Sequence, residues 1–208
     1  MVEYDLAPPP YTEAESTLDK RMVTNHSVEL SELRPATQYA YLVKSKNANG
    51  KESSTQPGDN YFVTAPQQNL KVGQSAWNAH KSVTLESATR TPSYSYQDPS
   101  SGLVTKRAPT GKIFIIVDAL VENTGTEIVN ASSMTFSMSD SHGLAYNPIS
   151  YPGKDAFDYM YVTLNPGKNT GGKILFEVAA SVTGLKLAYD FGTHATGSVL
   201  ATWALTFT

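Results

Sequence analysis

The chain has no cysteine, which excludes disulfide frameworks, cysteine-rich zinc sites and thiol catalysis. It also lacks an excess of positive charge, because 16 Lys and Arg stand against 19 Asp and Glu in 208 residues and give a formal net charge of −3. Without a basic surface field, we expect no nucleic-acid binding. No apolar run reaches the roughly 18 residues of a spanning helix, so no membrane span is expected in this segment.

Helical periodicity is scarce too, and the abundant residues are those of β-structure. The chain holds 14 Gly, 12 Pro and 12 Tyr, and its hydrophobic content of 40% can supply a sizeable core. This composition is typical of short strands joined by turns. The sequence therefore predicts an all-β protein.

Strict alternation of apolar and polar residues marks four segments of the second half. Every second residue of a half-buried strand lies on the same face, so each apolar set is expected to face a core. The sets are Met134, Phe136 and Met138; Ile174, Phe176 and Val178; Leu185, Leu187, Tyr189 and Phe191; and Val199, Ala201, Trp203 and Leu205. Residues 113–121 are apolar on both faces except at Asp118, which predicts a central strand.

Turn sequences separate these segments. They are Asn123-Thr-Gly125, Asp140-Ser-His-Gly143, Asn165-Pro-Gly167 and Gly171-Gly172. Only residues 12–22 carry a helical pattern, in which Thr12 and Glu15 have the spacing of a capping box. Either a short helix or a solvated loop explains that segment.

A change of composition near Ala65-Pro66 divides the chain. The strand pattern of the first part ends there in proline and amides, and a new pattern begins a few residues later. We interpret the sequence as two β-sandwich modules, residues 1–65 and 72–208, joined by a linker at residues 66–71.

The first module resembles the C-terminal part of a fibronectin type III domain. The stretch Leu33-Arg-Pro35-Ala-Thr37-Gln-Tyr39 keeps the spacing of that family's corner between two strands. The resemblance implies that Tyr39 packs its ring inward while its hydroxyl bonds backbone a few residues upstream. A hairpin with a type I′ turn is expected at Asn49-Gly50, because both central positions of that turn need a positive φ.

This first module is too short for a whole sandwich. Such a domain needs about 100 residues, so the equivalents of its first three strands are missing. Either the sequence is cut inside the domain, or another segment or chain completes the sheet. An open apolar face and free strand edges would then cause self-association.

The second module resembles a family of secreted, immunoglobulin-like domains of unknown function that is related to a mycobacterial immunoprotective antigen. The matching blocks run in order from Val72-Gly-Gln74 through residues 111–125 and 136–143 to Leu185-Lys-Leu187. The resemblance implies an extracellular or cell-surface setting in an archaeon or bacterium and no known chemistry. An export signal would lie outside this segment or have been removed.

Motifs for catalysis, metals and cofactors are incomplete. Residues 167–173 match the start of a P-loop, but Ile174 stands where magnesium needs Ser or Thr, and a strand follows in place of a helix. Residues 45–56 imitate an EF-hand loop without its first and last carboxylates. Asp140 could touch a cation, but a hairpin tip explains it better.

The four histidines are far apart in sequence and form no zinc pair. Spacing alone says nothing against a Ser-His-Asp triad assembled from distant residues. We predict no enzyme, no metal and no cofactor.

Two aromatic segments, residues 94–98 and 151–161, are the candidate binding loops. Rings beside carboxylates and amides bind sugars and protein surfaces through flat apolar faces and directional polar groups. The candidate residues are Tyr94, Tyr96, Asp155, Asp158 and Tyr159. A structural explanation is also open, because Phe157, Tyr159 and Tyr161 share one parity and could face the core from a strand.

We predict a non-catalytic, extracellular or cell-surface binding or spacer module that recognises a protein or glycan by loops on a rigid sandwich. Two alternatives stay open: a building block of a prokaryotic surface layer or filament, in which strand edges join copies, and an accessory module of a secreted hydrolase. Asn25 and Asn130 lie in N-glycosylation sequons, whose use the sequence leaves undetermined.

Overall fold

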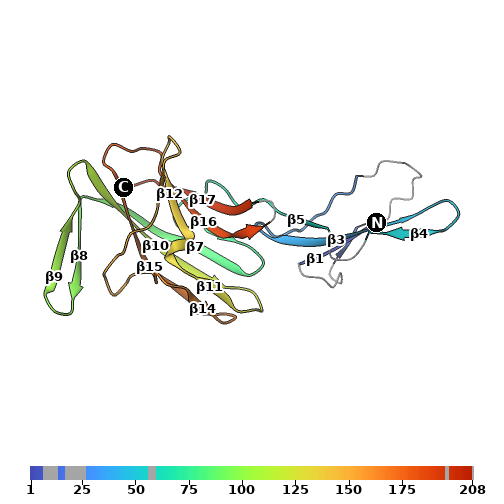
Figure 1. Ribbon diagram of the computed structural model, residues 1–208, viewed down its shortest axis with the longest axis horizontal. Helices are drawn as coiled ribbons and strands as arrows, with labels where there is room; N and C mark the ends of the chain where they lie inside the picture. The colour runs from blue at the N-terminus through green and yellow to red at the C-terminus, as the bar shows by residue number, and fades with distance from the viewer. Residues whose placement is uncertain (7–13, 17–26, 56–59, 195–196, 208) are drawn as a thin grey trace.

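A single-layered sheet and a sandwich lie along the long axis of the molecule (Figure 1). The computed structural model describes residues 1–6, 14–16, 27–55, 60–194 and 197–207. The regular structure of these residues consists of β-strands, and the only helical element that they contain is a 3-10 turn. The prediction of an all-β protein is therefore confirmed. Within these ranges, no helix has the length and apolar character needed to cross a membrane.

The N-terminal region is one antiparallel sheet. It contains β1 (Val2–Leu6), β2 (Ala14–Glu15), β3 (Gln38–Lys46), β4 (Glu52–Ser54) and β5 (Tyr61–Val63), in the order β2-β1-β3-β4, with β5 also paired to β3. Three rings gather on one face: those of Tyr39 and Phe62 stack at 5.5 Å, and Tyr41 lies 5.9 Å from Phe62. The described strands of this region form no second layer.

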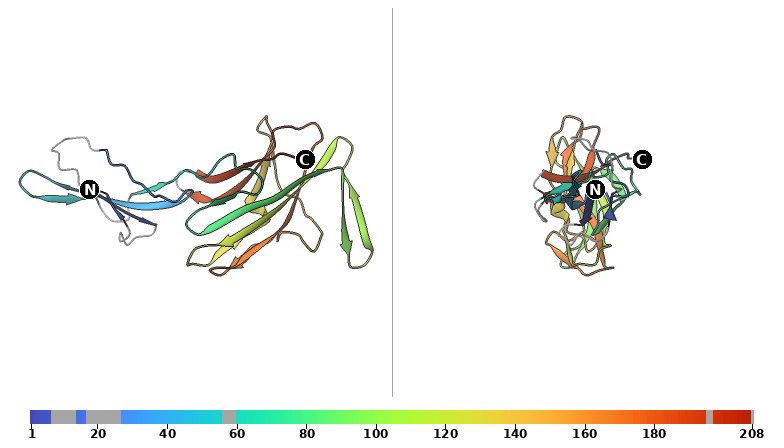
Figure 2. Two further views of the ribbon diagram at one scale, coloured as in Figure 1. Left: turned by 180° about the vertical axis from the view of Figure 1, so that it is seen from behind. Right: turned by 90° about the vertical axis from the view of Figure 1, so that its right-hand side faces the viewer.

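Two facing sheets form the sandwich (Figures 1 and 2). One contains β6 (Ser75–Trp77), β7 (Lys81–Thr91), β10 (Lys112–Asn123) and β15 (Asn169–Ala179) in the order β15-β10-β7-β6. The other contains β12 (Phe136–Ser139), β13 (Ala145–Tyr146), β16 (Lys186–His194) and β17 (Gly197–Ala204) in the order β13-β12-β16-β17. Two small pairs complete the fold: β11 (Val129–Ala131) with β14 (Val162–Leu164), and β8 (Ser93–Asp98) with β9 (Gly102–Arg107).

The core of the sandwich confirms three of the four alternating sets. Every apolar residue of the three sets on or directly beside β15, β16 and β17 is buried in the core. At the centre, Trp203 donates its indole N–H to the carbonyl of Gln74 at 2.8 Å, and the rings of Phe136 and Tyr189 meet at 4.9 Å. Every buried polar side-chain atom of the described residues has a hydrogen-bond partner.

The fourth set is only partly correct. Phe136 and Met138 are buried on β12, but Met134 is mostly exposed. The reason is local, because Ser132 caps a 3-10 turn (Ser133–Thr135) by accepting the N–H of Met134 at 3.1 Å. That turn shifts Met134 off the face that the alternation assigned to it.

The predicted central strand is β10, which pairs with β7 on one side and β15 on the other. Its residues Ile115, Val117, Ala119 and Val121 are fully buried in the core. Asn123 closes the strand from a fully buried position, where its side-chain amide donates to the carbonyls of Glu127 and Leu164 at 2.7 and 2.9 Å. The central position of this segment is confirmed.

One local prediction for the N-terminal region is wrong, and one of two open alternatives there fails. The hairpin between β3 and β4 is present, but Asn49 lacks a positive φ and the turn is therefore not type I′. The side chain of Asn47 accepts the N–H groups of Asn49 and Lys51 at 3.0 and 2.9 Å and stabilises a wider loop. The helix option for residues 12–22 fails at Ala14–Glu15, which form β2 against β1; Thr12 and residues 17–22 lie outside the described residues.

The predicted tyrosine geometry is confirmed. The ring of Tyr39 is buried, and its hydroxyl accepts the N–H of Arg34 at 2.9 Å. Next to it, Ala36 is buried in the core of the sandwich, and the hydroxyl of Thr37 accepts the N–H of Ala79 at 3.1 Å. These contacts attach the N-terminal sheet to the sandwich.

The predicted linker, residues 66–71, is hydrogen-bonded along β17. The N–H of Leu70 donates to the carbonyl of Thr202 at 2.9 Å, and the N–H of Ala204 donates to the carbonyl of Leu70 at 2.8 Å. This segment therefore covers one edge of the sandwich as well as connecting the two regions. The division into two modules stays a prediction.

Candidate functional site

Residues 147–161, here called the docked loop, connect β13 to β14 and lie against the outer edge of β15. The N–H of Ile149 donates to the carbonyl of Leu175 at 2.8 Å, and Lys173 bonds residues 155 and 157 through its backbone at 2.8 and 2.9 Å. Gly172 permits this approach, because a Cβ there would lie 2.6 Å from the carbonyl oxygen of Asp155. The loop therefore has a fixed position on the sandwich and covers the edge of β15.

The β8–β9 hairpin, here called the arm, stands off the sandwich at the end opposite the N-terminal sheet (Figures 1 and 2). Asp98 holds its turn by accepting the N–H groups of Ser100 and Ser101 at 2.9 and 2.8 Å and the hydroxyl of Ser101 at 2.7 Å. The hydroxyl bond is the main cause that lowers the pKa of Asp98. The arm is thus preorganised although it pairs with no other described strand.

A ring cluster, made of Tyr94, Tyr96, Phe114 and Tyr151, joins the arm to the docked loop. The ring of Tyr94 meets Phe114 edge-on at 5.0 Å and lies 5.5 Å from Tyr151 and 6.3 Å from Tyr96. Burial raises the pKa of Tyr94, and the nearby Tyr96 and Tyr151 raise it further. Tyr94 therefore keeps its hydroxyl proton at neutral pH and can donate or accept a hydrogen bond.

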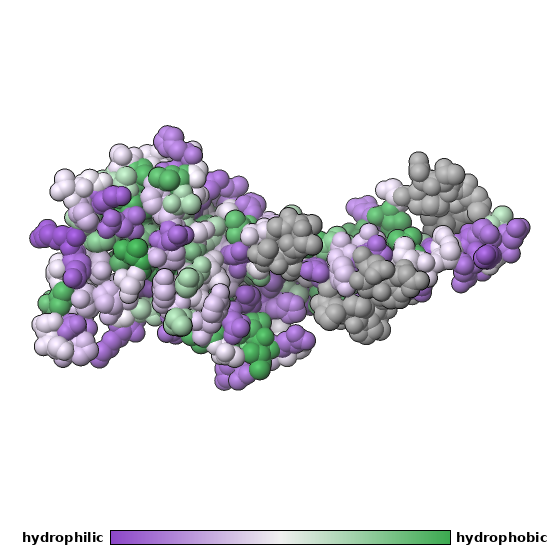
Figure 3. All heavy atoms as spheres, in the orientation of Figure 1, coloured by the Kyte–Doolittle hydropathy of each residue, from purple (hydrophilic) through white to green (hydrophobic). Residues whose placement is uncertain are grey.

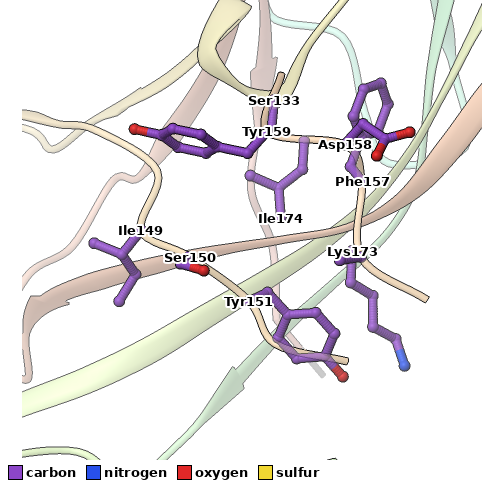
Figure 4. Close-up of a pocket in the computed structure, with 10 residues that line it drawn as sticks. Ser133, Ile149, Ser150, Tyr151, Phe157, Asp158, Tyr159, Lys173 and Ile174 are labelled. Carbon is purple, nitrogen blue, oxygen red and sulfur yellow. The ribbon is translucent and has the colours of Figure 1, made fainter. Parts of the chain in front are cut away.

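A cavity of about 120 Å³ lies between the docked loop and β15. Figure 4 shows Ile149 and Tyr151 on one stretch of the loop and Tyr159 on another, with Ile174 between them. Pockets for whole ligands measure roughly 300 Å³ or more, so this cavity suits one side chain or one substituent of a larger partner.

An ion pair borders the cavity. The Nζ of Lys173 lies 2.5 Å from a carboxylate oxygen of Asp155. The hydrogen bond from Lys173 is the main cause that lowers the pKa of Asp155, and the hydroxyl of Tyr151 makes a smaller contribution. The same bond raises the pKa of Lys173. Both groups are therefore charged over the whole neutral range, and their ion pair links the docked loop to β15.

Comparison with known proteins bears on the sandwich. Residues 70–199 match the family described as "Domain of unknown function (DUF4352)", which is more than half of the chain. The chain belongs to the DUF4352 family. No curated protein matches it. The match agrees with the second resemblance noted in the sequence, whereas the fibronectin type III resemblance of residues 1–65 stays a prediction.

Several solved structures are similar to this DUF4352 protein. The yjhA protein from Bacillus subtilis is 16% identical, with 66% of this chain and 99% of that chain covered and a TM-score of 0.50. MPT63, a secreted protein from Mycobacterium tuberculosis, is 15% identical over 67% of this chain and 98% of its own, with a TM-score of 0.47. An uncharacterized β-sandwich protein from Clostridium difficile is 12% identical, with 73% of this chain and 100% of that chain covered and a TM-score of 0.46. At 16% identity, the likeness to the yjhA protein concerns the fold alone.

The structure of the DUF4352 protein brings the candidate residues to one end of the sandwich. Tyr94 and Tyr96 belong to the ring cluster, and Asp155 lies in the ion pair beside it. Asp158 and Tyr159 line the cavity. The sequence analysis considered Lys173 only as part of the rejected P-loop motif, because its spacing on β15 carries no sign that a distant loop docks on it.

The structural explanation for the second aromatic segment holds for one residue of three. Phe157 is buried, with 3% of its surface exposed, whereas Tyr159 exposes 49% and Tyr161 exposes 66%. These residues precede β14 and form no strand, so the shared parity does not direct all three rings inward. Two of the three are therefore available to a partner.

The motifs that the sequence analysis rejected have structural roles. Residues 165–168 form a turn with Gly167 at φ +72°, and β15 follows, as expected for a turn and not for a P-loop. Asp140 accepts the N–H groups of His142 and Leu144 at 2.9 and 3.0 Å in a hairpin tip. In the described part of the chain, no three His, Asp or Glu side chains are placed to hold a metal ion.

Proposed function

We propose that this DUF4352 protein is a non-catalytic binding module that acts outside the cell or on its surface. The surface formed by the ring cluster and the cavity binds a protein or glycan, and the sandwich holds that surface rigid. The ring contact between Tyr94 and Tyr151 at 5.5 Å carries the proposal. It joins two segments that lie more than 50 residues apart in sequence into one surface.

The chemistry of this surface supports recognition rather than catalysis. Half-exposed rings give apolar contact area at a low cost in side-chain entropy, and neighbouring carboxylates give direction. The Asp155 carboxylate is already paired with Lys173, and no His or Ser side chain of the described residues bonds to it. The residues around the cavity therefore offer no general base and nucleophile in contact.

The distribution of hydrophobic residues supports binding through small anchors. Figure 3 shows hydrophobic residues in separate small areas among hydrophilic ones on the face in view. A partner of such a surface is held by a few well-placed contacts and not by one broad apolar interface. The extracellular setting is proposed from the sequence resemblance alone, and protease treatment of intact cells that make the protein tests it.

A glycan array and a partner pull-down test the binding proposal. The wild-type chain is compared with a variant carrying Tyr94→Ala, Tyr96→Ala and Tyr159→Ala, after circular dichroism has shown that both are folded. We expect a ligand that the wild type captures and the triple variant loses. Equal capture by the two chains, or no ligand in either assay, contradicts the proposal.

A second candidate function is that of a structural building block, and the N-terminal sheet favours it. Its described strands form one layer, in which β2 and β5 each pair on one side only. We propose that another copy completes this sheet, as an open strand edge allows. Light scattering of the full chain beside the chain without residues 1–65 tests this. We expect a larger assembly for the full chain, and assemblies of the same number of copies for both chains contradict the proposal.

A further inference from the structure

The tip of the arm presents one large apolar side chain to solvent. Leu103 exposes 68% of its surface and follows directly after the turn that Asp98 stabilises. An isolated two-stranded hairpin buries little apolar area of its own. The ordered tip thus holds a leucine away from any core, which is the geometry of an anchor residue.

Charges on the arm and near the cavity are complementary. Arg107 shares a strand face with Leu103, and neither it nor Lys106 has an acidic partner among the described residues. Asp158 lines the cavity and has no basic partner in the same part of the chain. Lys154, the nearest unpaired cation in sequence, does not line the cavity.

The cavity fits the tip in size, and part of its wall is apolar. Ile149 and Ile174 contribute apolar walls, the buried Phe157 also lines it, and its volume of about 120 Å³ has room for one aliphatic side chain. In the single chain, the arm stands off the sandwich and its tip does not line this cavity (Figure 1). An arm tip that enters this cavity therefore belongs to another molecule.

We propose that Leu103 of a second copy of this chain enters the cavity and that Arg107 of that copy pairs with Asp158. The root of the arm contacts the docked loop through Tyr94 and Tyr151, so anchor and cavity lie at the same end of each molecule. Two reciprocal insertions then close a two-fold dimer. This inference rests on the proposed function, because it names a partner for the same surface.

Disulfide trapping tests the contact directly, because the natural chain has no cysteine. A Gln97→Cys chain is mixed with a differently tagged Ser150→Cys chain and oxidised with copper phenanthroline. Gln97 lies opposite Leu103 on the arm, and Ser150 lines the cavity. Leu103 and Arg107, which are proposed to make the contact, are therefore left unchanged. We expect a disulfide that links the two differently tagged chains.

Two controls make the trapping specific. The pair of Gln97→Cys with Thr126→Cys, an exposed residue outside the cavity, is expected to give several-fold less product. Adding Leu103→Asp to the Gln97→Cys chain is expected to remove the product. Equal yields from the control pair, or a product that persists with Leu103→Asp, overturn the proposal.

Sedimentation of the full chain separates this inference from the proposed function. We expect a dimer whose dissociation constant rises at least about 30-fold with Leu103→Asp, as for loss of an anchor residue. The control Leu144→Asp, at a leucine that exposes 59% of its surface against 68% for Leu103, should leave the dissociation constant unchanged. A wild-type monomer at high concentration overturns the inference. If that monomer still captures a ligand through its tyrosines, the proposed binding function stands although the dimer inference is wrong.

Discussion

The sandwich and the N-terminal sheet are built from similar strands but are stabilised differently. The sandwich buries a continuous core between two sheets, from Val83 on one to Trp203 on the other. The N-terminal sheet has one layer, and its described residues bury few side chains besides Tyr39, Ala40 and Leu42. Because stability comes mainly from apolar burial between layers, the sandwich should hold most of the free energy of unfolding.

The largest expected effect lies at the centre of the sandwich. Trp203→Ala removes a fully buried indole and should lower the free energy of unfolding by about 3–5 kcal/mol. Urea denaturation followed by circular dichroism measures this. The control is Trp77→Ala, because Trp77 exposes 43% of its surface. Similar losses at both positions would contradict the assignment of the core to the two facing sheets.

The junction between the regions gives the next effect. Thr37→Val keeps the side-chain shape but removes the hydroxyl that accepts the N–H of Ala79 and donates to the carbonyl of Pro35 at 2.7 Å. Leaving that N–H unpaired should cost about 1–3 kcal/mol. Hydrogen exchange at the amide of Ala79 should speed up, whereas Thr126→Val should leave it unchanged. Unchanged exchange in Thr37→Val would mean that the regions are not coupled there.

A smaller effect is expected inside the N-terminal sheet. Tyr39→Phe deletes the hydroxyl that accepts the N–H of Arg34 and should cost about 1 kcal/mol. Hydrogen exchange of the amides in β3, measured by mass spectrometry, should speed up while the exchange of β10 does not change. Tyr61→Phe, at a ring with 45% of its surface exposed, is the matched control. Faster exchange in β10 would show that this sheet and the sandwich unfold as one unit.

The smallest effect is electrostatic. The pKa of Asp155 is lower in the folded chain than in the unfolded chain. The ionised Asp155 therefore adds to the free energy of unfolding above the unfolded-state pKa, and this stabilisation is lost as the pH falls through the folded-state pKa. The raised pKa of Lys173 gives a contribution that is lost only as the pH rises through its folded value. Both side chains are partly exposed, so Asp155→Asn should cost no more than about 1 kcal/mol at neutral pH.

Acid titration of the unfolding free energy checks this last expectation. The difference between wild type and Asp155→Asn should shrink toward zero in acid and also in high salt, which screens the pair. Glu52→Gln is the corresponding change in the N-terminal sheet, where Glu52 pairs with Lys46 at 3.2 Å. A difference that grows in acid would contradict the assigned direction of the Asp155 pKa.

The alternation of apolar and polar residues and the turn sequences between the strands were sufficient to predict most of the sandwich. The alternation over β15, β16 and β17 identified their buried faces, because a strand in a two-layer fold has one face in the core. The same rule failed at Met134 because a serine cap starts a 3-10 turn there. At Asn49-Gly50 it was the side chain of Asn47 that set the turn, a local bond that the dipeptide alone does not reveal.

The residues of the candidate site could be predicted from the composition of two segments, but the contact between those segments could not. Tyrosines beside carboxylates pointed to residues 94–98 and 151–161, but nothing in their spacing indicated that Tyr94 would meet Tyr151. That contact depends on a loop docked on β15 through backbone hydrogen bonds and a close approach at Gly172. Backbone bonds carry no side-chain signature, so this part of the site required a structure.

Hydroxyl-radical footprinting of the tyrosines, with and without a captured partner, tests the central claim most directly. Tyrosine occurs in both regions, so one experiment compares them. The account predicts that the partner protects Tyr94, Tyr151 and Tyr159 and leaves Tyr61 in the N-terminal sheet as reactive as before. Protection of Tyr61 with no change at the three tyrosines of the proposed surface would contradict it.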